Sequence, residues 1–428
     1  MVDPATGARL DDGLVLWFPA PHSATGEDVA ELHVHGSRAV LAAIIQVLHG
    51  LGLRLAEPGE FTRRAFLNGK LDLLQAEAIA DLVAAETEAQ RRQALRQLDG
   101  ELGRLYRGWS DRLTRVLAHL EAAIDFPDEN LPPETEDRIL GETAALAAEI
   151  QRHLADGHRG ERLRDGIMVA IIGPPNAGKS SLLNKIARRD AVITSPVAGT
   201  TRDIVEAAVD LQGYPVVLAD TAGLRDSDDV VEQEGLRRAL RRAEEAEIRL
   251  FVFDARCPDH AQGAAAWPGP DTVLVANKID LIWGENAPAT APWKLPHPNP
   301  LPASGEREGP AKREGEGRQS ANGSWNGLPE EAIPVSALTG EGIDSLLSAL
   351  GARVAQTFRI EAPVLTRARH RQALEDAAAA LRRAMAALLP ELRAEDLRLA
   401  LRSLGDITGT VDVEDLLDVI FRDFCIGK

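Results

Sequence analysis

Hydrophobic positions follow two different periods along the chain, and the change between them divides the chain into parts. About the first sixty residues mix two strand-like runs, GLVLWFPA and AELHVHG, with one helical run, AVLAAIIQVLHGLG. From about Arg63, apolar residues recur at helical spacing with no proline until Pro127. Helical spacing returns after Thr366. The pattern predicts helical segments on either side of a differently built middle part.

The middle part contains five apolar runs separated by polar or helical stretches: IMVAIIG, PVVLADTAG, RLFVFDA, TVLVANKID and AIPVSA. Continuous runs rich in β-branched residues predict a parallel sheet that is covered on both faces. The predicted fold class is therefore multidomain α+β. We expect an N-terminal α/β domain at 1–62, an all-α helical domain made of 63–160 plus 359–428, and an α/β domain inserted at 161–358.

Residues 284–330 differ in composition from the rest of the inserted domain. About a third of them are proline or glycine, and such a stretch seldom packs. We predict a disordered surface insertion, with a regulatory or docking loop as the alternative.

Composition narrows the class of protein. The hydrophobic share of 44% is that of a globular protein, and no apolar run reaches the ~20 residues that span a bilayer. The first residues lack the basic and apolar stretches of a secretory signal, so we expect a cytoplasmic protein with no membrane partner. Cys257 and Cys425 are too few for a disulfide framework. The formal charge of −18 argues against broad electrostatic binding of nucleic acid.

The stretch GPPNAGKSS follows a predicted strand and opens a predicted helix, which is the context of a phosphate-binding P-loop. Gly173 and Gly178 permit the tight turn, and amide groups at the helix start can cradle a β-phosphate. Lys179 can reach the β and γ oxygens, and Ser180 can bind Mg²⁺. The expected nucleotide contacts in this loop are Asn176, Ala177, Gly178, Lys179, Ser180 and Ser181.

Two later motifs indicate guanine as the base. In NKID, Asp280 can accept hydrogen bonds from the ring N–H and the amino group of guanine, a pattern that adenine does not present. SALTGEG can supply a backbone amide near Ala337 for the guanine carbonyl oxygen. The expected base contacts are Asn277, Lys278, Asp280, Ser336, Ala337 and Leu338.

Two segments lie where guanine-nucleotide-binding P-loop proteins carry the switches that sense the bound nucleotide. In AVITSPVAGTTRDI, Thr201 can complete Mg²⁺ coordination when the γ-phosphate is present. In DTAGLR, Asp220 can hold Mg²⁺ through water and the Gly223 amide can meet the γ-phosphate. Leu224 stands where many GTPases have a glutamine that orients the attacking water. The expected switch contacts are Ser195, Thr200, Thr201, Asp220, Thr221, Ala222 and Gly223.

The characteristic features of the chain are PNAGKSSLLN, AGTTRD, DTAGLR, the flanking helical segments and the final CIGK. Together they resemble the MnmE/TrmE family of tRNA modification GTPases. The resemblance covers nearly the whole chain apart from 284–330. It implies a GTP hydrolase that works with a flavin-containing partner to add an aminomethyl or carboxymethylaminomethyl group at C5 of the wobble uridine of tRNA. It also implies a homodimer that forms a heterotetramer with this partner. The partner would hold the FAD, since no Gly-x-Gly-x-x-Gly follows a strand in this chain.

The resemblance also suggests what replaces the missing glutamine. The family implies hydrolysis activated by K⁺ once two G domains meet, with ligands matching the Asn176 side chain and the backbone carbonyls of Ser195, Val197 and Thr200. A cation there would offset the charge that builds on the leaving phosphate. In the alternative interpretation, Asn176 is only a turn residue.

The family further places the water-orienting role on a glutamate that matches Glu232. The neighbouring acidic residues Asp228, Asp229 and Glu234 leave open a second interpretation, in which this stretch is a solvated acidic helix start. Arg202 and Arg225 would stabilise the switches.

The N-terminal region resembles a folate-binding module. The family implies a tetrahydrofolate derivative, 5-formyl or 5,10-methylene, at an interface between two N-terminal domains, with contacts matching Glu31, Lys70 and Lys428. A carboxylate can bond the adjacent donors of a reduced pterin, and lysines suit a glutamate tail; Glu31 equally fits the polar face of a strand. The family begins with a glycine-rich strand segment that carries a folate-contacting arginine, and this sequence starts after that segment, so we expect a domain truncated at its start.

Two further groups of residues have open roles. His33 and His35 alternate in HVHG and should share one face of a strand, where structural histidines are more plausible than a metal site. The family implies that Cys425 acts in tRNA modification, whereas a buried thiol could also anchor the C-terminus.

The rival interpretation is a GTP-gated scaffold or ribosome-assembly GTPase without one-carbon chemistry. Such proteins usually add an RNA-binding module or a second G domain, and the pattern indicates neither.

Overall fold

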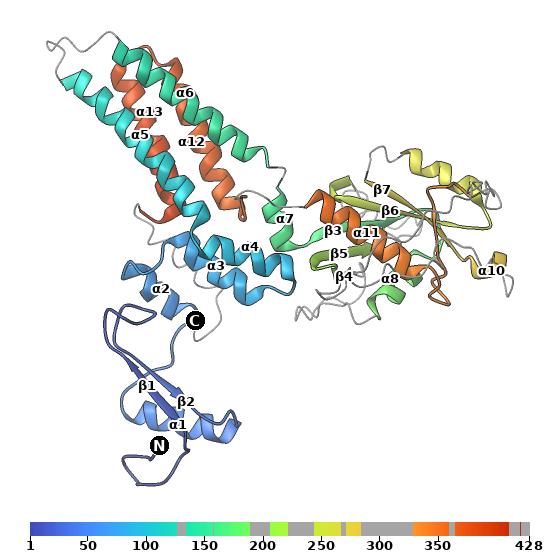
Figure 1. The fold of residues 1–428 in the computed structure, drawn as a ribbon, viewed down its shortest axis with the longest axis horizontal. Helices are drawn as coiled ribbons and strands as arrows, with labels where there is room; N and C mark the ends of the chain where they lie inside the picture. The colour runs from blue at the N-terminus through green and yellow to red at the C-terminus, as the bar shows by residue number, and fades with distance from the viewer. Residues whose placement is uncertain are drawn as a thin grey trace, which may run out of the picture. The chain divides into compact units, whose positions relative to one another are not determined.

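The computed structural model describes residues 1–125, 134–156, 158–188, 206–220, 244–266, 271–283, 328–358, 364–410 and 420 (Figure 1). The chain forms two compact units. One contains Met1–Arg164 and Ile360–Lys428, and the other contains Asp165–Arg359. In the described part of the chain, no helix has the length and apolar character needed to cross a membrane.

The first unit begins with a small α/β part. Strand β1 (Leu14–Phe18) pairs antiparallel with β2 (Val29–His33), and α1 (Arg38–Gly50) follows, as the pattern predicts. The side chain of Ser37 caps α1 by accepting a hydrogen bond from the Val40 amide. Helix α2 (Glu60–Leu67) begins three residues before Arg63, the predicted start of the helical region.

The other elements that the structure describes in this unit are helices. Its helices are α3 (Leu73–Ala84), α4 (Glu88–Leu98), α5 (Glu101–Asp125), α6 (Glu134–Leu154), α7 (Arg159–Asp165), α12 (Ala368–Ala386) and α13 (Pro390–Thr408). Capping boxes begin α3 at Asp72 and α4 at Thr87. Helices α5, α6, α12 and α13 pack side by side around one apolar core that includes Leu113, Leu146, Leu381 and Leu404 (Figure 1). Segments from before and after the second unit therefore build a single core.

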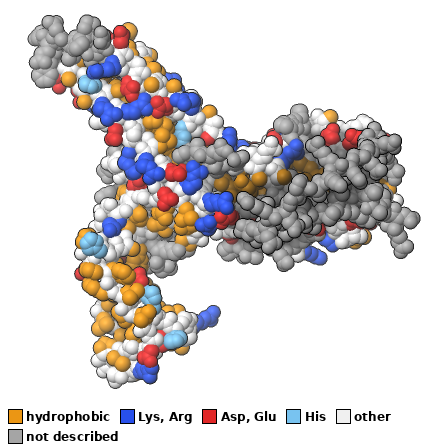
Figure 2. Space-filling view, viewed as in Figure 1, with side chains coloured by type: hydrophobic (Ala, Val, Ile, Leu, Met, Phe, Trp, Pro, Cys, Tyr) orange, Lys and Arg blue, Asp and Glu red, His pale blue; other side chains and the backbone are white. Residues whose placement is uncertain are grey.

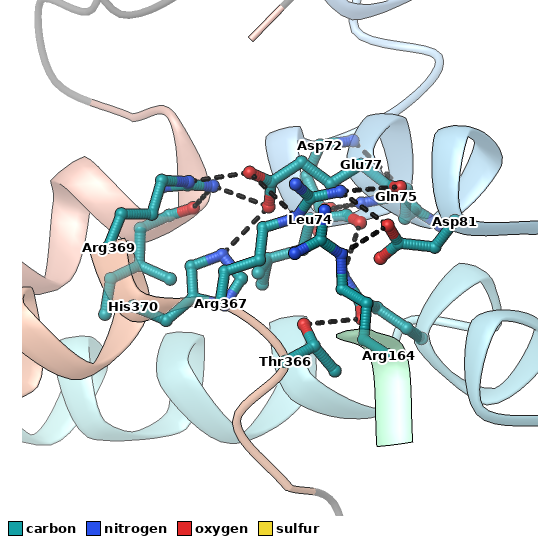
Figure 3. A network of polar contacts seen from close by, with 12 residues as sticks. Asp72, Leu74, Gln75, Glu77, Asp81, Arg164, Thr366, Arg367, Arg369 and His370 are labelled. Carbon is teal, nitrogen blue, oxygen red and sulfur yellow. Dashed lines mark hydrogen bonds and ion pairs between the residues drawn. The ribbon is translucent and has the colours of Figure 1, made fainter. Parts of the chain in front are cut away.

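Acidic side chains of α3 hold the start of α12 (Figure 3). Arg369 donates to both carboxylate oxygens of Glu77, each at 2.7 Å, and His370 Nε2 donates to the same group at 2.8 Å. Asp81 accepts from Arg367 at 2.7 Å and from Arg164 Nε at 3.0 Å. Cations at a helix N-terminus oppose the helix dipole, so the carboxylates of α3 supply the favourable partner. Arg164 precedes the second unit in the sequence and Arg367 follows it, and both bond to Asp81 of α3.

The second unit contains a six-stranded sheet with the order β4-β5-β3-β6-β7-β8. The strands are β3 (Ile167–Ile172), β4 (Glu206–Leu211), β5 (Tyr214–Asp220), β6 (Ile248–Asp254), β7 (Thr272–Asn277) and β8 (Ile333–Pro334). Strand β4, which the apolar runs of the sequence do not predict, pairs antiparallel with β5, so the sheet is mixed and not purely parallel. Only every second residue of β4 is buried, which explains why it lacks the continuous apolar run of its neighbours.

Both faces of this sheet are covered. Val169 and Ile171 pack into one core with residues of α8 (Lys179–Ala187) and α11 (Ile343–Thr357). Ala170 and Ile172 face the opposite core, which the 3₁₀ helix η1 (Pro258–Ala266) helps to cover; the short α10 (Asp280–Trp283) follows β7. Leu328, which the sequence analysis included in the insertion, packs against this second core.

Candidate nucleotide site

The predicted phosphate loop joins β3 to α8 and has two glycines at which any other residue would be strained. Gly173 has φ 139°, and a Cβ there would lie 2.0 Å from the Val252 carbonyl oxygen. Gly178 has φ 92° and begins α8, and a Cβ there would lie 2.3 Å from Asn277 Nδ2. The close approach of neighbouring strand ends therefore requires glycine at both positions.

Lys179 and Ser180 occupy the first turn of α8. Lys179 Nζ donates to the carbonyls of Gly173 at 2.8 Å and Pro174 at 2.9 Å, and burial lowers the pKa of this amine. Ser180 Oγ donates to the carboxylate of Asp220, which ends β5 beside β3. Hydroxyl and carboxylate oxygens are ligands that Mg²⁺ prefers, so Ser180 and Asp220 fit the predicted ion.

The NKID motif supports the phosphate loop from β7. Asn277 is 1% exposed; its Nδ2 donates to the Ala177 carbonyl at 2.8 Å, and its Oδ1 accepts from the Ala337 amide at 3.0 Å. Lys278 Nζ donates to the Asn176 carbonyl at 2.5 Å. Asn277 thus links the phosphate loop to SALTGEG, two motifs that lie far apart in the sequence.

A pocket of about 500 Å³ opens between these motifs. Asp280 Oδ1 accepts from Ser336 Oγ at 2.6 Å, which orients the carboxylate predicted to bind guanine. The pocket is lined by these predicted contacts: Gly178, Ser181, Asn277, Lys278, Asp280, Ala337 and Leu338.

Other residues that line this pocket belong to none of the predicted motifs. Asn184 and Lys185 of α8, and Arg188 directly after this helix, follow Ser181 at helical spacing. The Lys185 amine also donates to the Leu338 carbonyl at 3.1 Å. The i+3, i+4 and i+7 spacing after the phosphate loop was the signal that could have revealed them.

Several predicted site residues lie outside the described residues, so the structure places none of them. They include the first switch, most of the second and the C-terminal tail: Ser195, Val197, Thr200, Thr201, Arg202, Thr221, Ala222, Gly223, Leu224, Arg225, Asp228, Asp229, Glu232, Glu234, Cys425 and Lys428.

The predicted folate contacts in the described part each have another partner. Glu31 is exposed on β2 and bonds to His33 Nε2 at 3.0 Å, while Lys70 Nζ donates to the Pro21 carbonyl at 2.9 Å. His35 lies beyond the end of β2 and bonds to Asp11 at 2.9 Å, so the predicted shared strand face for the two histidines is wrong. Among the residues that the structure describes, no group of three or more His, Cys, Asp and Glu side chains is placed to hold a metal ion.

The site combines a phosphate loop after β3 with the Ser180–Asp220 pair, which fits Mg²⁺, and with a pocket at NKID and SALTGEG, which fits guanine. These features define a P-loop GTPase. The family model described as "MnmE helical domain" matches residues 73–425, and the model described as "GTP-binding protein TrmE N-terminus" matches residues 1–70. The chain therefore belongs to the MnmE family of tRNA modification GTPases, and it is a GTP hydrolase that acts in tRNA modification.

Similar curated proteins span almost the entire chain. The tRNA modification GTPase MnmE of Rhodospirillum rubrum is 56% identical over 425 residues, which cover 99% of this chain and 85% of that protein. The protein of the same description from Parvibaculum lavamentivorans is 53% identical over 432 residues, which cover 100% of this chain and 89% of the relative.

Solved structures provide a weaker comparison. The crystal structure of Era in complex with MgGDPNP and nucleotides 1506–1542 of 16S ribosomal RNA is 24% identical and has a TM-score of 0.29. The match covers 52% of this chain and 69% of that chain, and a similarity at this level supports no functional argument.

Proposed function

We propose that this chain is a K⁺-activated GTPase that, with a flavin-containing partner, adds an aminomethyl or carboxymethylaminomethyl group at C5 of the wobble uridine of tRNA. Membership of the MnmE family and the nucleotide site support this proposal. The observation that carries the GTPase part is the meeting of Lys179, Ser180 and Asp220 at one edge of the sheet. We place this activity in the cytoplasm.

K⁺ activation is supported by the position of Asn176. This residue is exposed on the phosphate loop in a left-handed conformation with φ 61°, and its main-chain carbonyl is already bonded to Lys278. The side-chain oxygen is therefore the part of Asn176 that fits a monovalent cation. With Ser195, Val197 and Thr200 it would hold K⁺, which supplies positive charge near the leaving phosphate when bound.

A homodimer through the N-terminal part is supported by apolar surface. Figure 2 shows hydrophobic side chains gathered over the part that contains β1, β2 and α1. Among the large exposed residues there are Leu14, Val15, Trp17, Leu41 and Ile45. Contiguous exposed apolar surface is characteristic of an interaction site. The dimer would bind the flavin-containing partner as a heterotetramer.

We further propose a tetrahydrofolate derivative, 5-formyl or 5,10-methylene, as the one-carbon source. Its proposed contacts are Glu31, Lys70 and Lys428, and its support is the match of residues 1–70 to the TrmE N-terminal model. To bind it, Glu31 would exchange its bond with His33 for the pterin donors, and Lys70 would leave the Pro21 carbonyl.

Two residues are assigned by family resemblance. Glu232 would orient the attacking water, so Glu232→Ala should slow GTP turnover about a hundredfold with little change in GTP affinity. Cys425 would act in tRNA modification, so Cys425→Ser should retain GTP hydrolysis and lose modification, because a hydroxyl is far less acidic than a thiol.

Nucleoside analysis of tRNA from a strain that lacks this protein tests the proposed function. The modified wobble uridine should disappear, return with the wild-type gene, and remain absent with Lys179→Ala. Unchanged nucleosides together with sedimentation of the protein on ribosomal particles would favour the scaffold interpretation and overturn the proposal.

A further inference from the structure

Asp254 lies at the carboxyl end of β6, beside the nucleotide site, although the sequence analysis assigns no role to this residue of the run RLFVFDA. Strands β6 and β7 are parallel, and their register pairs Asp254 with Asn277, the first residue of NKID. The carboxyl ends of parallel strands form the edge where α/β sheets bind ligands. The topology therefore brings this carboxylate to the residues around the phosphate loop.

The carboxylate of Asp254 holds the side chain of Lys278. Lys278 Nζ donates to Asp254 Oδ2 at 2.9 Å and to the Asn176 carbonyl at 2.5 Å. Asp254 Oδ1 accepts from the Arg256 amide and Nε at 3.0 Å each, and Oδ2, which also accepts from Lys278, accepts from Arg256 Nη2 at 2.6 Å. The bonds to Arg256 and then to Lys278 hold the pKa of Asp254 well below its usual range. Asp254 is therefore a fixed negative charge beside the Lys278 ammonium.

Lys278 and Asn176 both need support from their surroundings. Their φ angles are 68° and 61°, a left-handed conformation that residues with a side chain seldom adopt. The bond from Lys278 Nζ joins the two residues directly, and Asn277 Nδ2 fixes the next carbonyl of the loop, that of Ala177. Asn277 and Lys278, two successive residues of NKID, thus bond to two successive carbonyls of the phosphate loop. The Lys278 ammonium also pairs with the carboxylate of Asp254.

We propose that Asp254 is a positioning residue for nucleotide binding at this GTPase site, and that it acts through Lys278. Its charge keeps the ammonium on the Asn176 carbonyl and thereby keeps the phosphate loop in the conformation that receives the β-phosphate. The proposal rests on the GTPase activity of the family and on the assignment of 173–181 as the phosphate loop. It requires neither K⁺ nor folate.

Asp254→Asn tests this role because it keeps the size of the side chain and removes its charge. Release of a fluorescent GDP analogue from the purified full-length chain should become about tenfold faster, since a charge-assisted hydrogen bond is weakened. The thermal midpoint without nucleotide should stay close to that of the wild type. Asp210→Asn is the matched control: its carboxylate accepts from the Gly213 amide at the end of β5 opposite Asp220, and its GDP release should equal that of the wild type.

A double-mutant cycle shows whether Asp254 acts through Lys278. If it does, Asp254→Asn with Lys278→Gln should release GDP no faster than Lys278→Gln alone. Additive effects, or release from Asp254→Asn at the wild-type rate, would overturn the proposal. So would a lowered midpoint with unchanged GDP release, because that result indicates a purely structural residue. A wild-type chain that fails to bind GDP would overturn the phosphate-loop assignment as well.

Asp254→Glu replaces Asp254→Asn if the latter does not fold. The extra methylene moves the carboxylate away from its present position, 2.9 Å from Lys278 Nζ. GDP release should then be at least about threefold faster, a change of the size expected for a weakened hydrogen bond. Release at the wild-type rate would again contradict the role of Asp254.

Discussion

Arg369 donates two hydrogen bonds of 2.7 Å to the carboxylate of Glu77, although the two residues lie 292 positions apart in the chain. Glu77 is 1% exposed and also accepts from His370, so almost none of its charge is solvated by water (Figure 3). Helix α3 precedes the second unit in the sequence, and α12 follows it. This ion pair therefore helps to hold together a unit whose two parts are separated by an entire inserted domain.

Replacing Glu77 should destabilise the unit that contains the helical core. Glu77→Gln leaves the Arg369 guanidinium half-enclosed without its counter-charge, which costs ~3 kcal/mol or more when a buried pair loses one member. Chemical denaturation followed by the helical circular dichroism signal measures the loss. Glu88→Gln is the control, because Glu88 on α4 also pairs with two arginines but is exposed. An equal loss in both variants would show that burial does not set the strength of the Glu77 pair.

The same pair predicts how stability depends on pH. Burial alone would raise the pKa of Glu77, but the bonds and charges of His370 and Arg369 outweigh it and hold the pKa far below its ordinary value of 4.5. A carboxylate whose pKa is lower in the folded state than in the unfolded state stabilises the fold. This stabilisation is complete when the pH is above the pKa of the unfolded state, and it is lost as the pH falls toward the pKa of the folded state.

Denaturation of the wild type and of Glu77→Gln at several pH values checks this prediction. The difference between their free energies of unfolding should stay constant from about pH 7 to about pH 5. It should shrink once the pH falls below 4.5, the ordinary pKa of the Glu77 side chain. A difference that grows toward acidic pH would contradict the assigned direction.

Asn277→Ala should weaken both the second unit and its binding of GDP. The truncation leaves the buried Ala177 carbonyl and Ala337 amide without their partner, at a cost of ~1–3 kcal/mol. Denaturation and titration with a fluorescent GDP analogue measure the two effects. Thr357→Ala removes an exposed hydroxyl of α11 that bonds only to its own helix, and it should change neither quantity. Wild-type behaviour of Asn277→Ala would mean that the two loops hold their positions independently.

GTP hydrolysis should be faster in KCl than in NaCl of equal ionic strength by about tenfold, or ~1.4 kcal/mol of barrier, because Leu224 leaves the second switch without the usual glutamine. Equal ionic strength keeps the screening the same. Asn176→Ala should remove most of the difference between the two salts. Equal rates for the wild type in both salts would exclude K⁺ activation.

The nucleotide site shows how far sequence patterns can lead. A phosphate loop has a fixed spacing because its glycines, lysine and serine act on one small group, so Gly173, Gly178, Lys179 and Ser180 were identifiable from adjacent residues. The strands β3, β5, β6 and β7 were evident because burial on both faces imposes continuous apolar runs. The antiparallel β4 was not, because an edge strand buried on one face resembles an ordinary polar stretch.

The sequence by itself determined the fold class and the motifs, since periodicity and motif spacing are properties of neighbouring residues. Only the tertiary structure decided which distant residues meet. Asp254 reaches Lys278 because β6 and β7 end side by side, and Glu77 reaches Arg369 because α12 returns to α3 after the inserted unit. A charged residue at a strand end or on a helix looks the same in the sequence whether it faces water or a buried partner. Its role depends on long-range packing, which no local pattern records.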